Sequence, residues 1–201
     1  MNAHHTADGL VSSTLQLIGE LVPEGARVLD LGCGDGTMLA HLQKMRGCTG
    51  YGIEIDDANV LACVQRGVNV IQLNLDEGLS MFEDATFDVV LQIDTLQNLR
   101  NAEVMLRETV RVGRFGVVAF PNFAHWPNRL SVLKGRMPVT RRLPYQWYNT
   151  PNIRVGTHAD LGVLARACGL KVLDQFGIHD GDTVRFAPNL LAGTSVYKLS
   201  R

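Results

Sequence analysis

The chain has 201 residues, enough for one domain with a full hydrophobic core and short for two, so we expect a single domain over residues 1–201. With 19% charged residues and a net charge of −1, its composition is typical of a globular protein and gives no electrostatic reason to expect nucleic acid or a membrane as a partner. No apolar run approaches the roughly 20 residues of a membrane span, and the first residues lack the pattern of a signal peptide.

The helical and strand-like patterns alternate along the first 120 residues. Apolar residues at helical spacing predict a first helix over 10–22, which ends at Pro23. The further predictions are strands at 26–31, 50–55, 68–73, 87–93 and 115–120, and helices at 36–45, 57–66 and 101–112. Near-continuous apolar strands separated by helices indicate a doubly wound, mostly parallel α/β sheet with helices on both faces.

The turn after the first predicted strand is rich in glycine. Gly32, Gly34 and Gly36 follow Asp30 and precede a predicted helix. Glycine adopts positive φ and lets the backbone approach a ligand, and a helix N-terminus offers free N–H groups. The spacing fits neither the dinucleotide pattern nor the phosphate loop. By itself it is also compatible with a plain strand-to-helix turn.

A carboxylate at the end of the second predicted strand narrows the class of ligand that the glycine turn could bind. Glu54 lies about 20 residues downstream of the glycine turn, where a carboxylate accepts hydrogen bonds from ribose hydroxyls. Asp30 and Glu54 together would repel a pyrophosphate but suit a cationic nucleoside. S-adenosylmethionine carries a sulfonium and an ammonium group, with ribose and adenine and no phosphate. The residues therefore favour S-adenosylmethionine as the cofactor.

The motifs at 26–36, 51–56 and 87–91 resemble those of class I S-adenosylmethionine-dependent methyltransferases. The resemblance implies a sheet of about seven strands with the last pair antiparallel. It also implies that Asp30 and the glycine turn face the methionine moiety, Glu54 the ribose, and Gln92 the methyl group. Asn74 replaces an Asp that often contacts adenine in this fold, but an amide can still donate and accept. The implied cofactor-binding residues are Asp30, Gly32, Gly34, Gly36, Glu54, Ile55, Asn74, Leu75 and Gln92.

The chain pattern changes after Pro121. Residues 121–159 hold both tryptophans, five of the seven prolines, six basic residues and no acidic one. A connection this long with little helical or strand pattern is usually functional or disordered, and its aromatic residues argue against disorder. A helix at 157–169, with a capping box, and strands at 170–176 and 192–200 are predicted to complete the chain.

A narrower resemblance covers most of the chain. The blocks at 120–153, 52–72 and 95–97 resemble the methionine biosynthesis protein MetW family. The first block contains Gly-Arg-Met-Pro-Val-Thr and Leu-Pro-Tyr-Gln-Trp-Tyr, at residues 135–140 and 143–148. The resemblance implies an accessory protein of methionine biosynthesis that works beside a homoserine O-acyltransferase, with S-adenosylmethionine as a sensor input.

The basic, aromatic stretch of about 121–156 has three interpretations. It is a solvated surface loop, a lid over the cofactor site that receives an anionic substrate, or a docking surface for an acidic partner patch. The residues that would form the lid or the partner contact are Trp126, Arg136, Arg141, Arg142, Tyr145, Trp147 and Tyr148.

No catalytic constellation is visible. The chain has neither Asn-Pro-Pro-Tyr nor a Pro-Cys dipeptide, and a lone histidine such as His125 or His158 is more often structural than a base. The four cysteines lack zinc-site spacing, so we expect no metal, and reduced, mostly buried thiols in a cytoplasmic protein. Whether the protein is an enzyme stays open, and the alternative function is methyl transfer to a small anionic acceptor.

Overall fold

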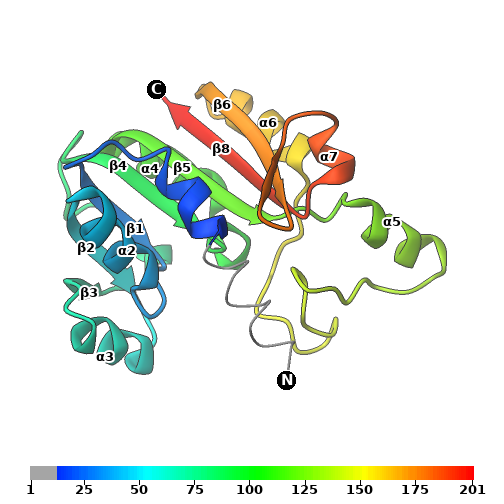
Figure 1. Cartoon of the computed structure of the whole chain (residues 1–201), viewed down its shortest axis with the longest axis horizontal. Helices are drawn as coiled ribbons and strands as arrows, with labels where there is room; N and C mark the ends of the chain where they lie inside the picture. Colours follow the sequence, from blue (N-terminus) through cyan, green and yellow to red (C-terminus); the bar gives the residue numbers. More distant parts are fainter. Residues whose placement is uncertain (1–12) are drawn as a thin grey trace.

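The structure is a computed structural model that describes residues 13–201, so the start of the helix predicted at 10–22 and the prediction for the N-terminus lie outside the described residues. Its centre is one sheet in the order β3-β2-β1-β4-β5-β8-β6-β7 (Figure 1). The strands are β1 (Arg27–Leu31), β2 (Thr49–Glu54), β3 (Val70–Gln72), β4 (Phe87–Ile93), β5 (Gly113–Pro121), β6 (Lys171–His179), β7 (Asp182–Val184) and β8 (Thr194–Ser200).

The first five strands pair in parallel, and β8 inserts antiparallel between β5 and β6. This confirms the predicted mostly parallel α/β sheet with antiparallel strands at its end. The described sheet has eight strands rather than about seven. The additional strand is β7, which forms a hairpin with β6 and which the sequence analysis missed because it has three residues and no apolar run.

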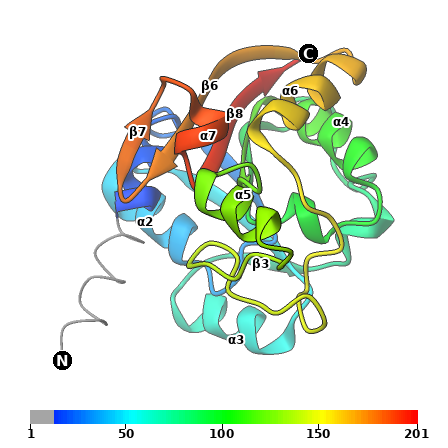
Figure 2. The same ribbon diagram turned by 90° about the vertical axis from the view of Figure 1, so that its right-hand side faces the viewer.

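Helices cover both faces of this sheet, as predicted (Figures 1 and 2). A helix over residues 13–19, α2 (Thr37–Arg46) and Cys63 of α3 (Asp57–Gln65) pack on one face. On the opposite face lie α4 (Ala102–Val112) and α6 (His158–Ala167). Successive residues of a strand point to opposite faces of the sheet. Val28 therefore packs on the face covered by α2, and Leu29 packs on the face covered by α4.

The helix ends agree with local sequence signals. The Asp56 side chain accepts a hydrogen bond from the N–H of Asn59 and caps α3. Thr157 caps α6 as predicted: its hydroxyl accepts from the N–H of Asp160, which is one half of a capping box, and donates to the Asp160 carboxylate. Both helices therefore begin where side chains satisfy their first N–H groups.

The long stretch after β5 contains more regular structure than its sequence suggested. It holds α5 (Trp126–Leu133), which begins with Pro127 in its first turn, where proline is tolerated. The remaining elements are the short helix α7 (Pro188–Leu191) and the 3₁₀ turns η1 (Leu75–Glu77) and η2 (Leu96–Asn98). In Figure 1 this stretch, green to yellow, extends beyond the carboxyl ends of β4 and β5.

Candidate functional site

The glycine turn connects β1 to α2, and its three glycines serve different purposes. All have positive φ: 69° at Gly32, 55° at Gly34 and 77° at Gly36. A Cβ on Gly32 would lie 2.6 Å from the hydroxyl oxygen of Thr95, and one on Gly36 would lie 3.0 Å from the sulfur of Cys63. A Cβ on Gly34 would meet no atom within 4 Å. Packing therefore explains two of the glycines, and only Gly34 borders open space.

Glu54 lies at the end of β2 and holds this turn in place. One carboxylate oxygen accepts a hydrogen bond from the N–H of Gly34 at 2.8 Å. The other accepts from the N–H groups of Ile55 and Asp56 at 2.8 and 3.0 Å. A carboxylate has about four acceptor positions, so one remains for another donor. Sequence analysis predicted this carboxylate at the sheet edge, but not its bond to the turn.

Asp30 lies beneath the turn rather than in contact with solvent. Its side chain is buried, and this burial, with a smaller effect of the Glu54 charge, raises the pKa of the Asp30 carboxyl to about 7. The uncharged acid is then well populated near neutral pH. Asp30 therefore adds a buried carboxyl near Glu54 at this edge of the sheet.

The residues that follow β2 and β3 form the outer part of this edge. Ile55 is 59% exposed, which leaves an apolar side chain free at the point where a planar ring could pack. Asn74 is partly buried and caps η1, where its side-chain oxygen accepts a hydrogen bond from the N–H of Asp76. Leu75 is buried in the core behind it.

Gln92 is not brought together with the other candidates. Its side chain is fully buried, and its amide nitrogen donates to the Thr109 hydroxyl at 2.5 Å and lies 3.5 Å from the Met105 carbonyl, both on α4. The side chain is therefore on the α4 face of the sheet. At the carboxyl end of β4 the side chains of Ile93 and Asp94 line a cavity instead.

These positions fit an adenine nucleoside with a positive charge. The open space at Gly34, the exposed Ile55 and the remaining acceptor position of Glu54 lie along one edge of the sheet. Such a group would supply an electrophilic methyl carbon if it were S-adenosylmethionine. The described residues 13–201 contain no group of His, Cys, Asp or Glu that could hold a metal ion. All four cysteines are buried and free, as expected.

The basic segment, which we define as residues 121–156, is fixed to the sheet edge at several points. One guanidinium nitrogen of Arg142 lies 3.1 Å from both carboxylate oxygens of Asp94. The N–H groups of Ile153 and Arg154 both donate to the carbonyl of Gln97 at 3.1 Å. The segment therefore covers the ends of β4 and β5 as an ordered structure.

Asn122 is the main anchor of this segment, and sequence analysis missed it. Its side-chain nitrogen donates to the carbonyls of Pro188, Asn189 and Ala192, and its oxygen accepts from the N–H groups of Ala124 and His158. The side chain is 1% exposed. An asparagine directly after an apolar strand was the available signal, because the amide both donates and accepts.

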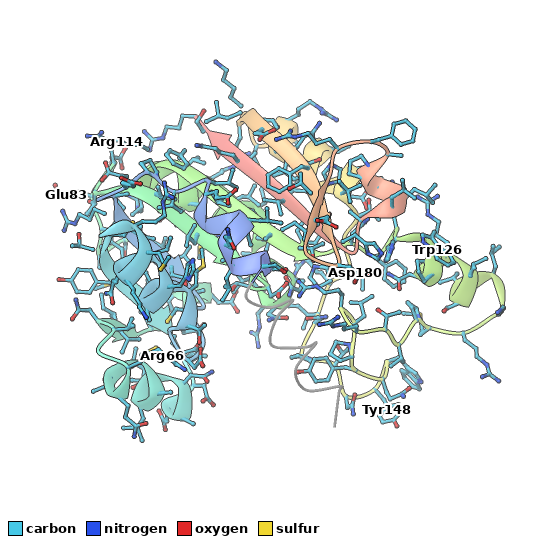
Figure 3. All side chains as sticks on the ribbon, viewed as in Figure 1. Arg66, Glu83, Arg114, Trp126, Tyr148 and Asp180 are labelled. Atoms are coloured by element: carbon cyan, nitrogen blue, oxygen red, sulfur yellow. The ribbon has the colours of Figure 1, made fainter. Side chains whose placement is uncertain are left out.

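Both tryptophans and both tyrosines of the basic segment are exposed, and Figure 3 labels Trp126 and Tyr148 among them. Trp147 and Tyr148 are 72% and 70% exposed, and their rings contact each other edge to face. Trp126 and Tyr145 are about half exposed, and Arg136 and Arg141 are exposed as well. The seven residues predicted as lid or partner contacts thus divide: Arg142 bonds to the sheet edge, and the others are largely accessible.

A cavity of about 340 Å³ lies between the basic segment and the sheet. It is lined by residues from the helix at 13–19, the ends of β4 and β5, α5 and the β6–β7 turn. His125 and His179 face each other there with ring centroids 4.8 Å apart, and burial, followed by the neighbouring His179, lowers the pKa of His125. His158 does not line this cavity: it is buried, and its ring packs on Tyr197.

Known proteins resemble this chain in both fold and sequence. A solved S-adenosylmethionine-dependent methyltransferase of Thermotoga maritima, a possible histamine N-methyltransferase, superposes with a TM-score of 0.70 at 20% identity over 97% of this chain and 90% of that one. Magnesium protoporphyrin IX methyltransferase of Synechocystis PCC 6803, solved with bound SAH, gives a TM-score of 0.64 at 18% identity over 98% and 83% of the two chains. These similarities confirm the class I methyltransferase-like fold. No helix of the described residues is long and apolar enough to cross a membrane.

The sequence comparisons are more specific. A bifunctional methionine biosynthesis protein MetXA/MetW of Rhodopirellula baltica is 36% identical over 197 residues, which are 90% of this chain and 32% of that protein. This chain spans about a third of the length of the curated relatives that it matches first. The model of the family described as methionine biosynthesis protein MetW matches residues 13–199. The chain therefore belongs to the MetW family of methionine biosynthesis proteins.

Proposed function

We propose that this protein binds S-adenosylmethionine and acts as an accessory protein of methionine biosynthesis, together with a homoserine O-acyltransferase whose activity it regulates. The observation that carries the proposal is the match to part of a bifunctional protein named MetXA/MetW. In that relative a single chain carries both names, MetXA and MetW. This supports the idea that the present chain works together with a second protein that corresponds to MetXA. The MetW resemblance implies that this partner is the acyltransferase.

The cofactor assignment is supported by the edge that runs from the glycine turn to Ile55. Gly34 leaves room for a ligand, Glu54 keeps an acceptor position, and Ile55 offers an exposed apolar contact. Solved methyltransferases that resemble this chain are 18–20% identical to it, so they support the fold and leave the ligand to be tested. In this proposal the ligand is the end product that signals to an early enzyme of its pathway.

The basic segment is the proposed docking surface. Trp126, Tyr145, Trp147 and Tyr148 are exposed aromatic residues, a type enriched at the centres of interfaces. The positive charges of the segment, with no acidic residue among them, would steer it toward an acidic patch of the partner.

The decisive experiment measures the acyltransferase of the same cell alone and with this protein, each with and without S-adenosylmethionine. A change in rate on addition of the protein supports the accessory role, and a further change with the ligand supports the sensor role. An unchanged rate in all four mixtures contradicts both.

A second function is methyl transfer to a small anionic acceptor. It is favoured by the cavity at the carboxyl end of β4. Transfer of the methyl group of S-adenosylmethionine to acceptors, followed by detection of S-adenosylhomocysteine, separates this function from the first.

A further inference from the structure

The cavity of about 340 Å³ has an apolar floor and a polar wall. Its floor consists of buried side chains, which include Ile18, Ala119 and Ile178. The polar part of the lining has basic, acidic and uncharged members: His125, Asn128, Thr140, Arg141, Arg142, His179, Asp94 and Asp180. The volume lies within the range of about 300 to 1,000 Å³ that is typical of small-molecule sites.

Three buried polar atoms of this lining have no partner among the described residues: Nε of Arg142, Nε2 of His125 and Oδ1 of Asn128. Another guanidinium nitrogen of Arg142 is bonded to Asp94, but its Nε is free and can only donate. Arg141 forms no ion pair within residues 13–201. A ligand that reaches these two arginines therefore has to accept hydrogen bonds.

Gly193 leaves the space between the polar groups open. A Cβ at this position would lie 3.6 Å from Cγ of Arg142, 3.7 Å from Nδ1 of His125 and 3.8 Å from Nδ1 of His179. These are ordinary contact distances, and the backbone of Gly193 does not have the positive φ that alanine avoids. The missing side chain thus leaves room beside the ring nitrogens of both histidines and the aliphatic part of Arg142.

We propose that this cavity binds a small carboxylate with a short aliphatic body. The planar guanidinium of Arg141 matches a carboxylate, which accepts two parallel hydrogen bonds. Adjacent N–H donors satisfy its remaining lone pairs, and the aliphatic body covers the apolar floor. The cavity is also the acceptor site of the second proposed function, so this inference rests on that function for its biological role and names the chemical class of the acceptor. The lining of the cavity does not include the glycine turn, and carboxylate binding does not require the proposed partner.

Titration of the whole protein with hexanoate, in the absence of S-adenosylmethionine, tests this inference. Hexylammonium has an aliphatic chain of the same length and the opposite charge, and is the matched control ligand. We expect saturable hexanoate binding, with amide chemical-shift changes in residues that line the cavity, and no such binding of hexylammonium. Equal binding of both ions, or binding of neither, overturns the proposal.

Variants locate the site. Arg141→Glu should weaken hexanoate binding at least about tenfold. Arg136→Glu is the control, because it makes the same charge change on an exposed residue of the basic segment that does not line the cavity. It should change binding less than about twofold. Gly193→Ala should weaken binding about fivefold without loss of the fold, because its Cβ takes up the room beside both histidines and Arg142. Equal effects of the two arginine variants, or unaltered binding by Gly193→Ala, contradict the assignment.

Discussion

Single residues decide whether the sheet edge can hold a ligand, and Gly34 gives the sharpest test. Gly34→Val would introduce a side chain into space that no protein atom occupies. Gly169→Val is a matched control, since Gly169 also has positive φ and open space around its Cβ position, but lies at the end of α6. Both substitutions strain the backbone by roughly 1–2 kcal/mol.

We therefore expect both valine variants to lose similar stability, and only Gly34→Val to lose S-adenosylmethionine binding, measured by calorimetry. Glu54→Ala should also reduce binding, but it removes three hydrogen bonds that hold the turn and is harder to interpret. Unchanged binding by Gly34→Val would show that the cofactor edge is assigned wrongly.

Asp30 should make the stability depend on pH. Its pKa of about 7 in the folded protein exceeds its usual value of 3.8, so its contribution to stability is complete below pH 4 and is lost as pH rises toward 7. The shift of about three units corresponds to at most about 4 kcal/mol. Asp30→Asn removes this titration.

Urea unfolding of both proteins between pH 4 and 8 provides the measurement for Asp30. The free energy of unfolding of the wild type, relative to that of Asp30→Asn, should fall over this range. A constant difference between the two proteins would show that Asp30 is ionised throughout.

Asn122→Ala removes five side-chain hydrogen bonds from a buried position. We expect a loss of about 3 kcal/mol in the free energy of unfolding, because buried carbonyl and N–H groups are left without partners. Asn69→Ala, at an exposed residue whose side chain donates one bond of 3.4 Å, should cost less than about 0.5 kcal/mol. Equal losses would contradict the role of Asn122 as an anchor.

At the scale of elements, the bond between Arg142 and Asp94 fixes the basic segment to β4. Both side chains are more than a third exposed, so the bond should contribute no more than about 1 kcal/mol. Arg142→Ala should therefore leave the protein folded but increase hydrogen exchange in residues 136–148. Arg136→Ala is the control, and a similar increase in that variant would show that the segment is not held by Arg142.

The elements also show which features are predictable from sequence. All described strands except β7, the glycine turn and the Glu54 carboxylate depend on local patterns, and they occur close to where the sequence indicated. The helix α5 escaped prediction because it is short, rich in exposed side chains and has a proline in its first turn. The face on which Gln92 lies could not be predicted, because β4 is apolar on both faces and has no alternation to reveal the side.

For the whole molecule, ligand binding at the edge of β1 and β2 should raise the stability of the folded state. At a concentration of 100 times its dissociation constant, a ligand adds about 2.7 kcal/mol, which for a chain of this size raises Tm by roughly 5–10 °C. S-adenosylmethionine should do so, and ATP at the same concentration should not, because the Glu54 carboxylate, together with the ionised fraction of Asp30, opposes its phosphates. Equal shifts with both ligands would contradict the proposed selectivity.

The position of β8 has a consequence for how this chain acquires its structure during synthesis. The last strand of the described chain inserts between β5 and β6, which precede it in sequence. Until it emerges from the ribosome, β5 and β6 have no common neighbour, and each exposes an unpaired edge. Gly193 and the carbonyls that Asn122 requires also arrive only then. The cavity and the anchored basic segment should therefore be the last parts of the molecule to form, after the glycine turn is already in place.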